Sequence, residues 1–147
     1  MDRRTRICIW IILIGLINFL SYAILYMFIG GEAVNGRVEI VSNQTLYVLQ
    51  SGHVVSHGVF LYSGLHSISI WLTVGAVMLA MLTLAKERIA SSMRSAIVRG
   101  RTLITILATI ITMIVIVMTI WFSLQFAWNL ANPQELPSRV TTPMPME

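Results

Sequence analysis

The sequence predicts an all-α membrane protein: a bundle of three transmembrane helices with a small extracytoplasmic β-hairpin between the first and second helices. Three observations predict this fold. Of the 147 residues, 56% are hydrophobic and only 11% are charged, against about 25% charged residues in an average soluble domain. Three uncharged segments exceed the roughly 18 apolar residues that indicate a membrane helix. The basic residues gather beside these segments, mostly on one predicted side of the membrane.

The three uncharged segments cover residues 7–29, 58–85 and 102–128. At about 1.5 Å per residue, each is long enough to cross a hydrocarbon core of about 30 Å with length left for tilt. The first segment is longer than the apolar core of a signal peptide, which has about 7–15 residues, so we expect it to be retained as a helix. All 4 prolines lie after residue 132, so we expect no proline kink in any helix.

Lysine and arginine flank the segments unequally, which predicts the orientation. Eight of the 10 lie in residues 1–6 and in the loop 86–101, and the other two lie in the loop 30–57 and the tail 129–147. Because cytoplasmic loops carry the excess of these residues, we expect a cell (plasma) membrane protein with a cytoplasmic N-terminus and an extracytoplasmic C-terminus. The net charge of +4 then favours anionic lipids of the inner leaflet over nucleic acid as its partner. The residues expected to meet these lipids are Lys86, Arg88, Arg94, Arg99 and Arg101.

The connecting segments differ in character. In the extracytoplasmic loop, β-prone runs at 37–41 and 45–49 predict a hairpin, which we expect to lean on the helix ends or on a third short strand near 54–55. The cytoplasmic loop 86–101 is basic and either extends the second helix or lies on the inner leaflet as an interfacial helix. The tail 129–147 is rich in proline and polar residues, which predicts disorder.

Small residues alternate at spacings of three and four along the second and third segments. Such a period keeps one seam of each helix facing a partner helix, and small or hydroxyl side chains allow close packing in lipid. Two alternatives remain open: the seams line a polar crevice, or the hydroxyls bond back to their own helix carbonyls. The seam residues are Thr105, Thr109 and Thr112 on the third segment, and Ser69, Thr73, Ala76 and Ala80 on the second.

His66 lies inside the second apolar segment, and an ionisable group at that depth is a functional hypothesis by default. Four other polar residues fall at comparable depth, so the sequence predicts one outward-opening polar pocket. The alternative is a neutral imidazole that fixes helix register through a hydrogen bond. The predicted pocket consists of Asn18, Tyr22, His66, Thr119 and Ser123.

The chain lacks the patterns of an enzyme: a Ser/His/Asp set, an HExxH motif and a glycine-rich phosphate loop. His53 and His57 lie four apart, but on extended chain they would be about 13 Å apart, which is too far for one metal ion. We therefore expect no metal and no cofactor. The expected function is a non-enzymatic accessory or regulatory subunit that forms a homo-oligomer or binds a larger membrane protein. The alternative is a small channel or a ligand sensor with its site around His66.

Overall fold

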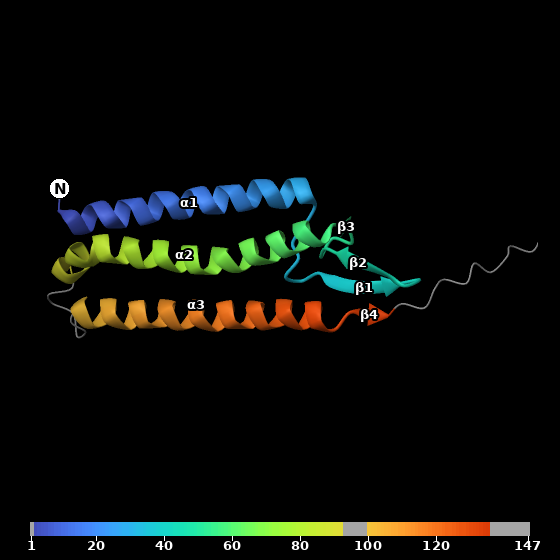
Figure 1. Ribbon diagram of the computed structural model, residues 1–147. Helices are drawn as coiled ribbons and strands as arrows, with labels where there is room; N and C mark the ends of the chain where they lie inside the picture. The colour runs from blue at the N-terminus through green and yellow to red at the C-terminus, as the bar shows by residue number, and fades with distance from the viewer. Residues whose placement is uncertain (1, 93–99, 136–147) are drawn as a thin grey trace, which may run out of the picture.

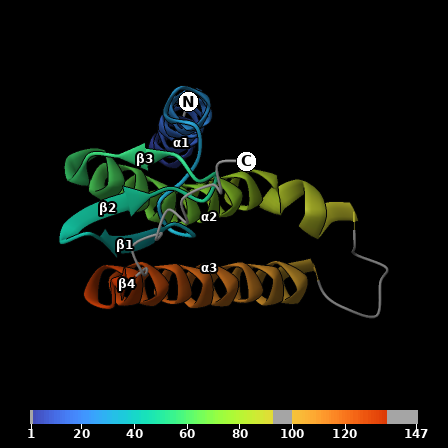
Figure 2. The same cartoon turned by 90° about the vertical axis from the view of Figure 1, so that its right-hand side faces the viewer.

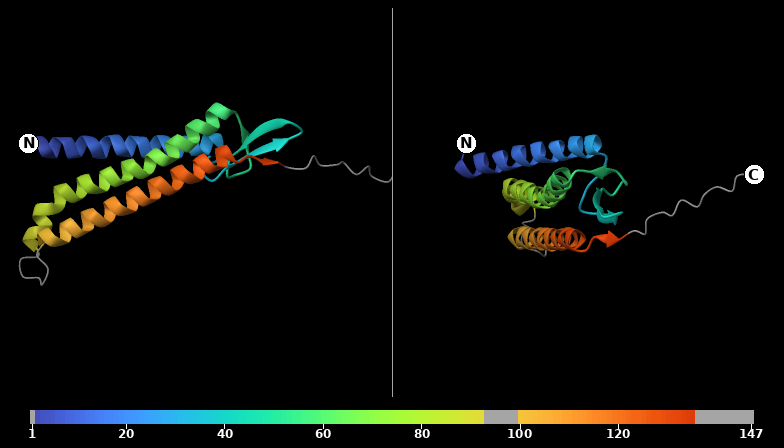
Figure 3. Two further views of the ribbon diagram at one scale, coloured as in Figure 1. Left: turned by 60° about the horizontal axis from the view of Figure 1, so that its bottom comes forward. Right: turned by 45° about the vertical axis from the view of Figure 1, so that its right-hand side comes forward.

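The computed structural model describes residues 2–92 and 100–135. Its three long helices are α1 (Arg3–Ile29), α2 (His57–Ser92) and α3 (Gly100–Ala131). The helix α2 lies between α1 and α3 (Figures 1 and 2). The helices α2 and α3 run side by side, whereas α1 runs at an angle to them (Figure 3). Each helix contains a span that is long and apolar enough to cross a membrane, and large apolar side chains are exposed along all three.

The helices are longer than the apolar segments, and their ends follow from local sequence. The helix α1 begins at Arg3 rather than at residue 7, and α2 continues to Ser92. Both extensions consist largely of residues that favour helix, and neither contains proline or glycine. Of the two alternatives for the loop 86–101, the structure shows an extension of the second helix as far as Ser92, while residues 93–99 lie outside the described part. At its other end α1 stops at Gly30, whose φ of 82° is left-handed and whose N–H donates to the carbonyl of Tyr26.

The segment after α1 folds into the predicted hairpin, formed by β1 (Arg37–Val41) and β2 (Gln44–Val48). The strands are antiparallel, with Arg37 opposite Val48 and Val41 opposite Gln44. Ser42 and Asn43 join them with φ values of 50° and 68°, the geometry of a tight turn that matches the twist of the two strands. The expected third strand is β3 (Val54–Val55), which pairs antiparallel with β2.

A fourth strand comes from the opposite end of the chain. Here β4 (Gln134–Glu135) pairs in parallel with β1 and gives the sheet the order β3-β2-β1-β4. Residues 129–131, also part of the expected tail, complete α3. The structure thus differs from the expected disorder in the first residues of the tail, because the free edge of β1 offers backbone groups that β4 satisfies. Residues 136–147 lie outside the described part.

The sheet and the adjoining helix ends enclose a small apolar core. Phe60 near the start of α2 is fully buried, and its ring lies 5.7 Å from that of Phe126 on α3 and 5.5 Å from that of Tyr47 on β2. The half-buried ring of Tyr47 thus packs against the two buried phenylalanine rings and ties the sheet to both helices. The other buried residues of this core are Ala33, Val38 and Leu49.

Glycines let the helices approach one another below this core. A Cβ at Gly15 of α1 would meet the side chain of Val77 on α2. On the other side of α2, a Cβ at Gly64 would meet the ring of Phe126, and one at Gly75 would lie 2.5 Å from Val115 Cγ2. Small residues at such contacts allow the close helix packing that membrane bundles need.

Candidate functional site

His66 lies on α2 with its half-buried ring turned toward α1. Its Nε2 is 3.2 Å from Asn18 Oδ1, while Asn18 Nδ2 donates to Thr73 Oγ1 at 3.1 Å. Because the amide nitrogen of Asn18 is used for Thr73, its oxygen faces the ring, and the imidazole donates through Nε2. Tyr22 and Tyr62 flank the ring edge-on, with centroids 5.6 and 5.5 Å away. The structure therefore brings three of the five predicted pocket residues together: Asn18, Tyr22 and His66.

Tyr22, which contacts His66 through its ring, also begins a separate set of hydrogen bonds that leads out of the helices. The hydroxyl of Tyr22 donates to Glu32 Oε2 at 2.8 Å, just after the end of α1. Asn35 Nδ2 donates to the second oxygen of Glu32, and Asn35 Oδ1 accepts from Gln125 Nε2 of α3 at 3.1 Å. One chain of polar groups thus joins α1, the loop before β1, and α3. Its donors are neutral hydroxyl and amide groups, and those of Tyr22 and Asn35 both donate to the carboxylate of Glu32.

Sequence reasoning missed Glu32, Asn35 and Gln125, although these residues complete the network. Glu32 is the first acidic residue after the first apolar segment. The available signal was a carboxylate that follows the end of an apolar helix, six residues after Tyr26. The partners Asn35 and Gln125 are 90 residues apart in sequence, and no local pattern announces such a pair.

The other two predicted pocket residues, Thr119 and Ser123, belong to α3. Both are half-buried, and α2 lies between their helix and α1 (Figure 1). Within residues 2–92 and 100–135, the buried Oγ1 of Thr119 has no hydrogen-bond partner. The five residues therefore belong to two separate places, three between α1 and α2 and two on α3.

The hollow beside His66 is small. It has a volume of about 10 Å³ and is lined by residues of α1, α2 and the intervening loop, among them Tyr22, Tyr26, Tyr62 and Ser63. A cavity needs roughly 10–15 Å³ to hold one water molecule. In this conformation the cluster therefore has room for a water molecule at most.

The predicted seam of α2 takes part in helix packing only in places. Thr73 accepts a hydrogen bond from Asn18 and donates to carbonyls of its own helix, and the hydroxyl of Ser69 donates to the carbonyl of His66. Ala80 is buried, whereas Ala76 is exposed. The seam thus contributes to the α1–α2 contact chiefly through Thr73.

The three seam residues of α3, Thr105, Thr109 and Thr112, are exposed, and we call them the threonine face. The hydroxyl of Thr109 donates to the carbonyl of Thr105 at 2.9 Å, and that of Thr112 to the carbonyl of Ala108 at 2.8 Å. A different face of α3 meets α2, where the rings of Phe122 and Trp71 stack 5.5 Å apart. Thr109 and Thr112 of the threonine face therefore lie on a side of α3 other than the one that meets α2 at Phe122.

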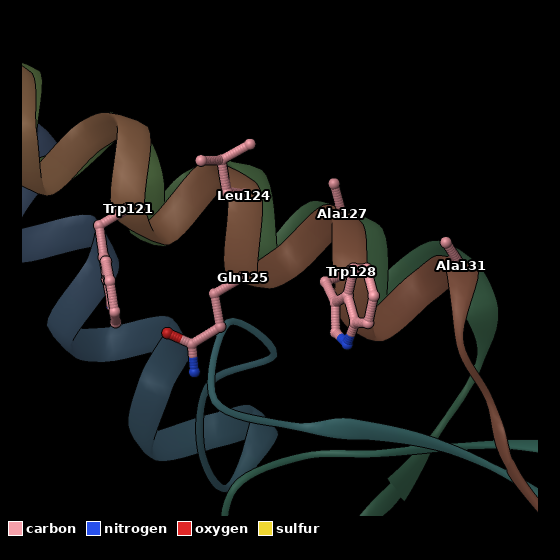
Figure 4. A pocket seen from close by; sticks show the side chains of 6 residues that line it. All are labelled: Trp121, Leu124, Gln125, Ala127, Trp128 and Ala131. Carbon is pink, nitrogen blue, oxygen red and sulfur yellow. The ribbon is translucent and has the colours of Figure 1, made fainter.

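A larger apolar hollow of about 700 Å³ lies along the sheet-ward end of α3. Trp121, Gln125 and Trp128 project to the same side of the helix (Figure 4). All of its lining residues come from α3 itself, and the two tryptophans are 65% and 69% exposed. It is therefore an open helix surface of the kind that tryptophan forms where a membrane meets water, rather than an enclosed binding site.

The possible metal ligands lie apart from one another in the part of the chain that the structure describes. There, no group of three or more His, Cys, Asp or Glu side chains lies close enough to hold an ion. His57 begins α2, whereas His53 lies in the turn before β3. Comparisons with protein families, curated proteins and solved structures find no match to this chain.

Proposed function

We propose that this protein is a non-enzymatic accessory or regulatory subunit of a membrane assembly, which associates through the threonine face of α3. The partner helix belongs to a second copy or to a larger membrane protein. The observation that carries the proposal is that the threonine face is exposed while α2 packs on another face of α3. Lipid gives no hydrophobic drive for helix association, so membrane helices associate where small side chains let their backbones approach closely.

The hydroxyls of this face have a limited part in the proposed contact. Thr109 and Thr112 already donate to carbonyls of their own helix, and such back-bonding leaves little for a neighbour. Their contribution is a shallow surface on which a second backbone can approach closely. The proposal therefore predicts sensitivity to added bulk rather than to the loss of a hydroxyl.

The proposed orientation places the sheet outside the cell and the N-terminus in the cytoplasm. In support, the N-terminus and the far end of α2 lie at one end of the bundle and the sheet at the other (Figure 1). Labelling with a membrane-impermeant maleimide tests this orientation in the Cys8→Ser background. We expect Ser42→Cys, at the exposed hairpin turn, to react in intact cells. Reaction only after lysis would reverse the orientation.

Site-specific cross-linking tests the assembly directly. A photo-reactive residue at position 109 of the full chain, in native membranes, is expected to give one product of fixed mass. The matched control is position 110, where Ile110 is also exposed but lies about 100° around the helix. The mass of the product distinguishes a second copy from a larger partner. Equal products from both positions, or none from position 109, would contradict the proposal.

Substitutions sharpen the same experiment. Thr112→Leu adds bulk to the threonine face and is expected to reduce cross-linking from position 109. Ile110→Phe adds bulk to the neighbouring face and should leave the yield unchanged. His66→Ala should leave it unchanged as well, because the proposed contact does not involve the cluster between α1 and α2.

The second candidate is a small channel or a ligand sensor built around His66, Asn18 and Tyr22. Its support is the ionisable His66 within the span of α2, since such groups often serve function in membranes. The volume of about 10 Å³ beside the ring requires the helices to separate before any ligand larger than water can enter. This candidate predicts that His66→Ala changes flux or ligand response while cross-linking from position 109 persists.

A further inference from the structure

A polar hollow of about 170 Å³ lies between α1 and α2, at the end of the bundle opposite the sheet. A water molecule in the liquid occupies about 30 Å³, so this hollow has room for a group of several heavy atoms. We call it the basic hollow. It is lined by Asp2, Arg4, Thr5, Cys8, Thr83, Leu84 and Lys86.

The two cations of the hollow come from different helices. Arg4 lies in the first turn of α1, and Lys86 lies near the far end of α2. Among the described side chains the one ion pair joins Arg37 and Glu39, which belong to the sheet. Arg4 and Lys86 thus have no carboxylate partner among those side chains, although Asp2 shares the lining and lowers its net charge to +1. Such a lining attracts a group that carries one negative charge.

Hydroxyl groups add to the chemistry of the hollow. The Thr83 hydroxyl donates to the carbonyl of Leu79 at 2.7 Å, so its proton is already used. Thr5 supplies a hydroxyl from α1. Together with the guanidinium of Arg4 and the ammonium of Lys86, this set of donors suits the oxygens of a phosphate.

The depth of the hollow indicates where such a phosphate comes from. The uncharged apolar stretch of α1 begins at Ile7, after Arg4, and that of α2 ends at Ala85, before Lys86. The hollow therefore lies at the level of lipid headgroups. Exposed apolar side chains adjoin it, including Leu84 in its lining and Ile7 on the next part of α1. Acyl chains can lie against these side chains while the phosphate enters the hollow.

We propose that the basic hollow binds the phosphate of an anionic phospholipid, held between Arg4 and Lys86. Basic pockets between transmembrane helices are the sites at which anionic headgroups bind selectively. This proposal places the lipid at one defined site, whereas a general attraction of basic residues for the leaflet would not. It adds Arg4 to the lipid contacts expected from the sequence and gives Lys86 a defined position. Of the other expected contacts, Arg94 and Arg99 lie outside the described residues, as do the side chains of Arg88 and Arg101.

Native mass spectrometry of the full chain, titrated with phosphatidylglycerol or phosphatidylcholine, tests the site. The double variant Arg4→Gln/Lys86→Gln is compared with Arg3→Gln/Arg6→Gln. The control loses the same number of positive charges at the same end of the bundle, from two exposed residues of α1 that do not line the hollow. We expect phosphatidylglycerol to bind more tightly than phosphatidylcholine. We expect about a tenfold loss of affinity in the first variant, as for two solvent-exposed ion pairs, and less than about a twofold loss in the control.

An equal loss in both double variants would show a diffuse surface attraction and overturn the proposal, as would no loss in the first. Asp2→Asn provides a variant that does not depend on removing a cation. Because it removes the negative charge of the lining, it should raise phosphatidylglycerol affinity about two- to threefold. Unchanged or weaker binding would overturn the proposal. Inorganic phosphate serves as a competitor. Displacement of the lipid at equal concentration would assign the hollow to free phosphate instead.

Discussion

The contact between Asn18 and His66 makes a quantitative prediction about the helices that it joins. Asn18→Leu keeps the approximate size of the side chain but removes both of its hydrogen bonds, to His66 and to Thr73. His66→Phe keeps an aromatic ring between Tyr22 and Tyr62 and removes the donor. Each single variant leaves one member of the Asn18–His66 pair without the other, whereas the double variant removes both members of the pair.

The expected size follows from the two bonds, whose lengths are 3.1 and 3.2 Å. Hydrogen bonds between membrane helices contribute about 0.6 kcal/mol on average and about 1.7 kcal/mol at most. Asn18→Leu should therefore lower the free energy of unfolding by about 1.2 kcal/mol and by no more than about 3.4 kcal/mol. The double variant should lose less than the sum of the single variants, by about 0.6–1.7 kcal/mol.

Reversible unfolding by SDS in mixed micelles, followed by circular dichroism, measures these differences. Thr112→Val, on the exposed threonine face of α3, serves as the distant control and should combine additively with Asn18→Leu. If Asn18→Leu costs the same with His66 present or absent, to within about 0.3 kcal/mol, the two side chains are not coupled. The reasoning about the cluster would then be refuted.

Two further predictions concern packing, and both are checked by the same unfolding measurement. Gly64→Ala should lower the free energy of unfolding by about 1–3 kcal/mol, since its Cβ would meet the ring of Phe126. A Cβ at Gly58 would meet nothing within 4 Å, so Gly58→Ala should leave the free energy of unfolding unchanged or raise it by up to about 1 kcal/mol. Equal effects at the two glycines would contradict the described α2–α3 contact. Phe60→Ala should cost about 3–5 kcal/mol because the ring is fully buried. Val59→Ala, at a residue that is 36% exposed, should cost clearly less, and similar losses would argue against a core centred on Phe60.

The helices and the hairpin were predictable because their signals are local. A helix that faces lipid is apolar on most sides, so a long uncharged run suffices to find it. The hairpin is marked by two β-prone runs around Ser42 and Asn43, whose side chains tolerate the left-handed turn better than branched apolar ones. The strand β4 carries no comparable signal. It is a two-residue parallel pairing with β1 that depends on where α3 ends.

The sequence predicts the depth of each polar residue in the membrane, and only the part of the candidate site that follows from depth was predictable. Depth places Asn18, Tyr22 and His66 at one level, and the structure joins them. Depth also selects Thr119, but it does not tell which helix lies in the middle of the bundle. With α2 between α1 and α3 (Figure 2), residues of α1 and α3 at the same level belong to different interfaces. The choice of α2 as the central helix rests on long-range packing, such as that of Gly64 against Phe126.

The side-chain hydrogen bonds that join different elements, among the described residues, lie in the sheet-ward half of the bundle. They begin at Asn18 on α1 and at Thr73 on α2 and continue to Gln125 and Asn129 of α3. The helix α1 has 27 residues and a length of about 40 Å. Arg4 lies 14 residues, or about 21 Å, from the tie at Asn18, so a rotation of about 5° about that tie shifts Arg4 by about 2 Å. The separation of Arg4 from Lys86 thus changes with small rotations of α1, and a headgroup bound between them would fix the angle of α1 at the end that is far from these hydrogen bonds.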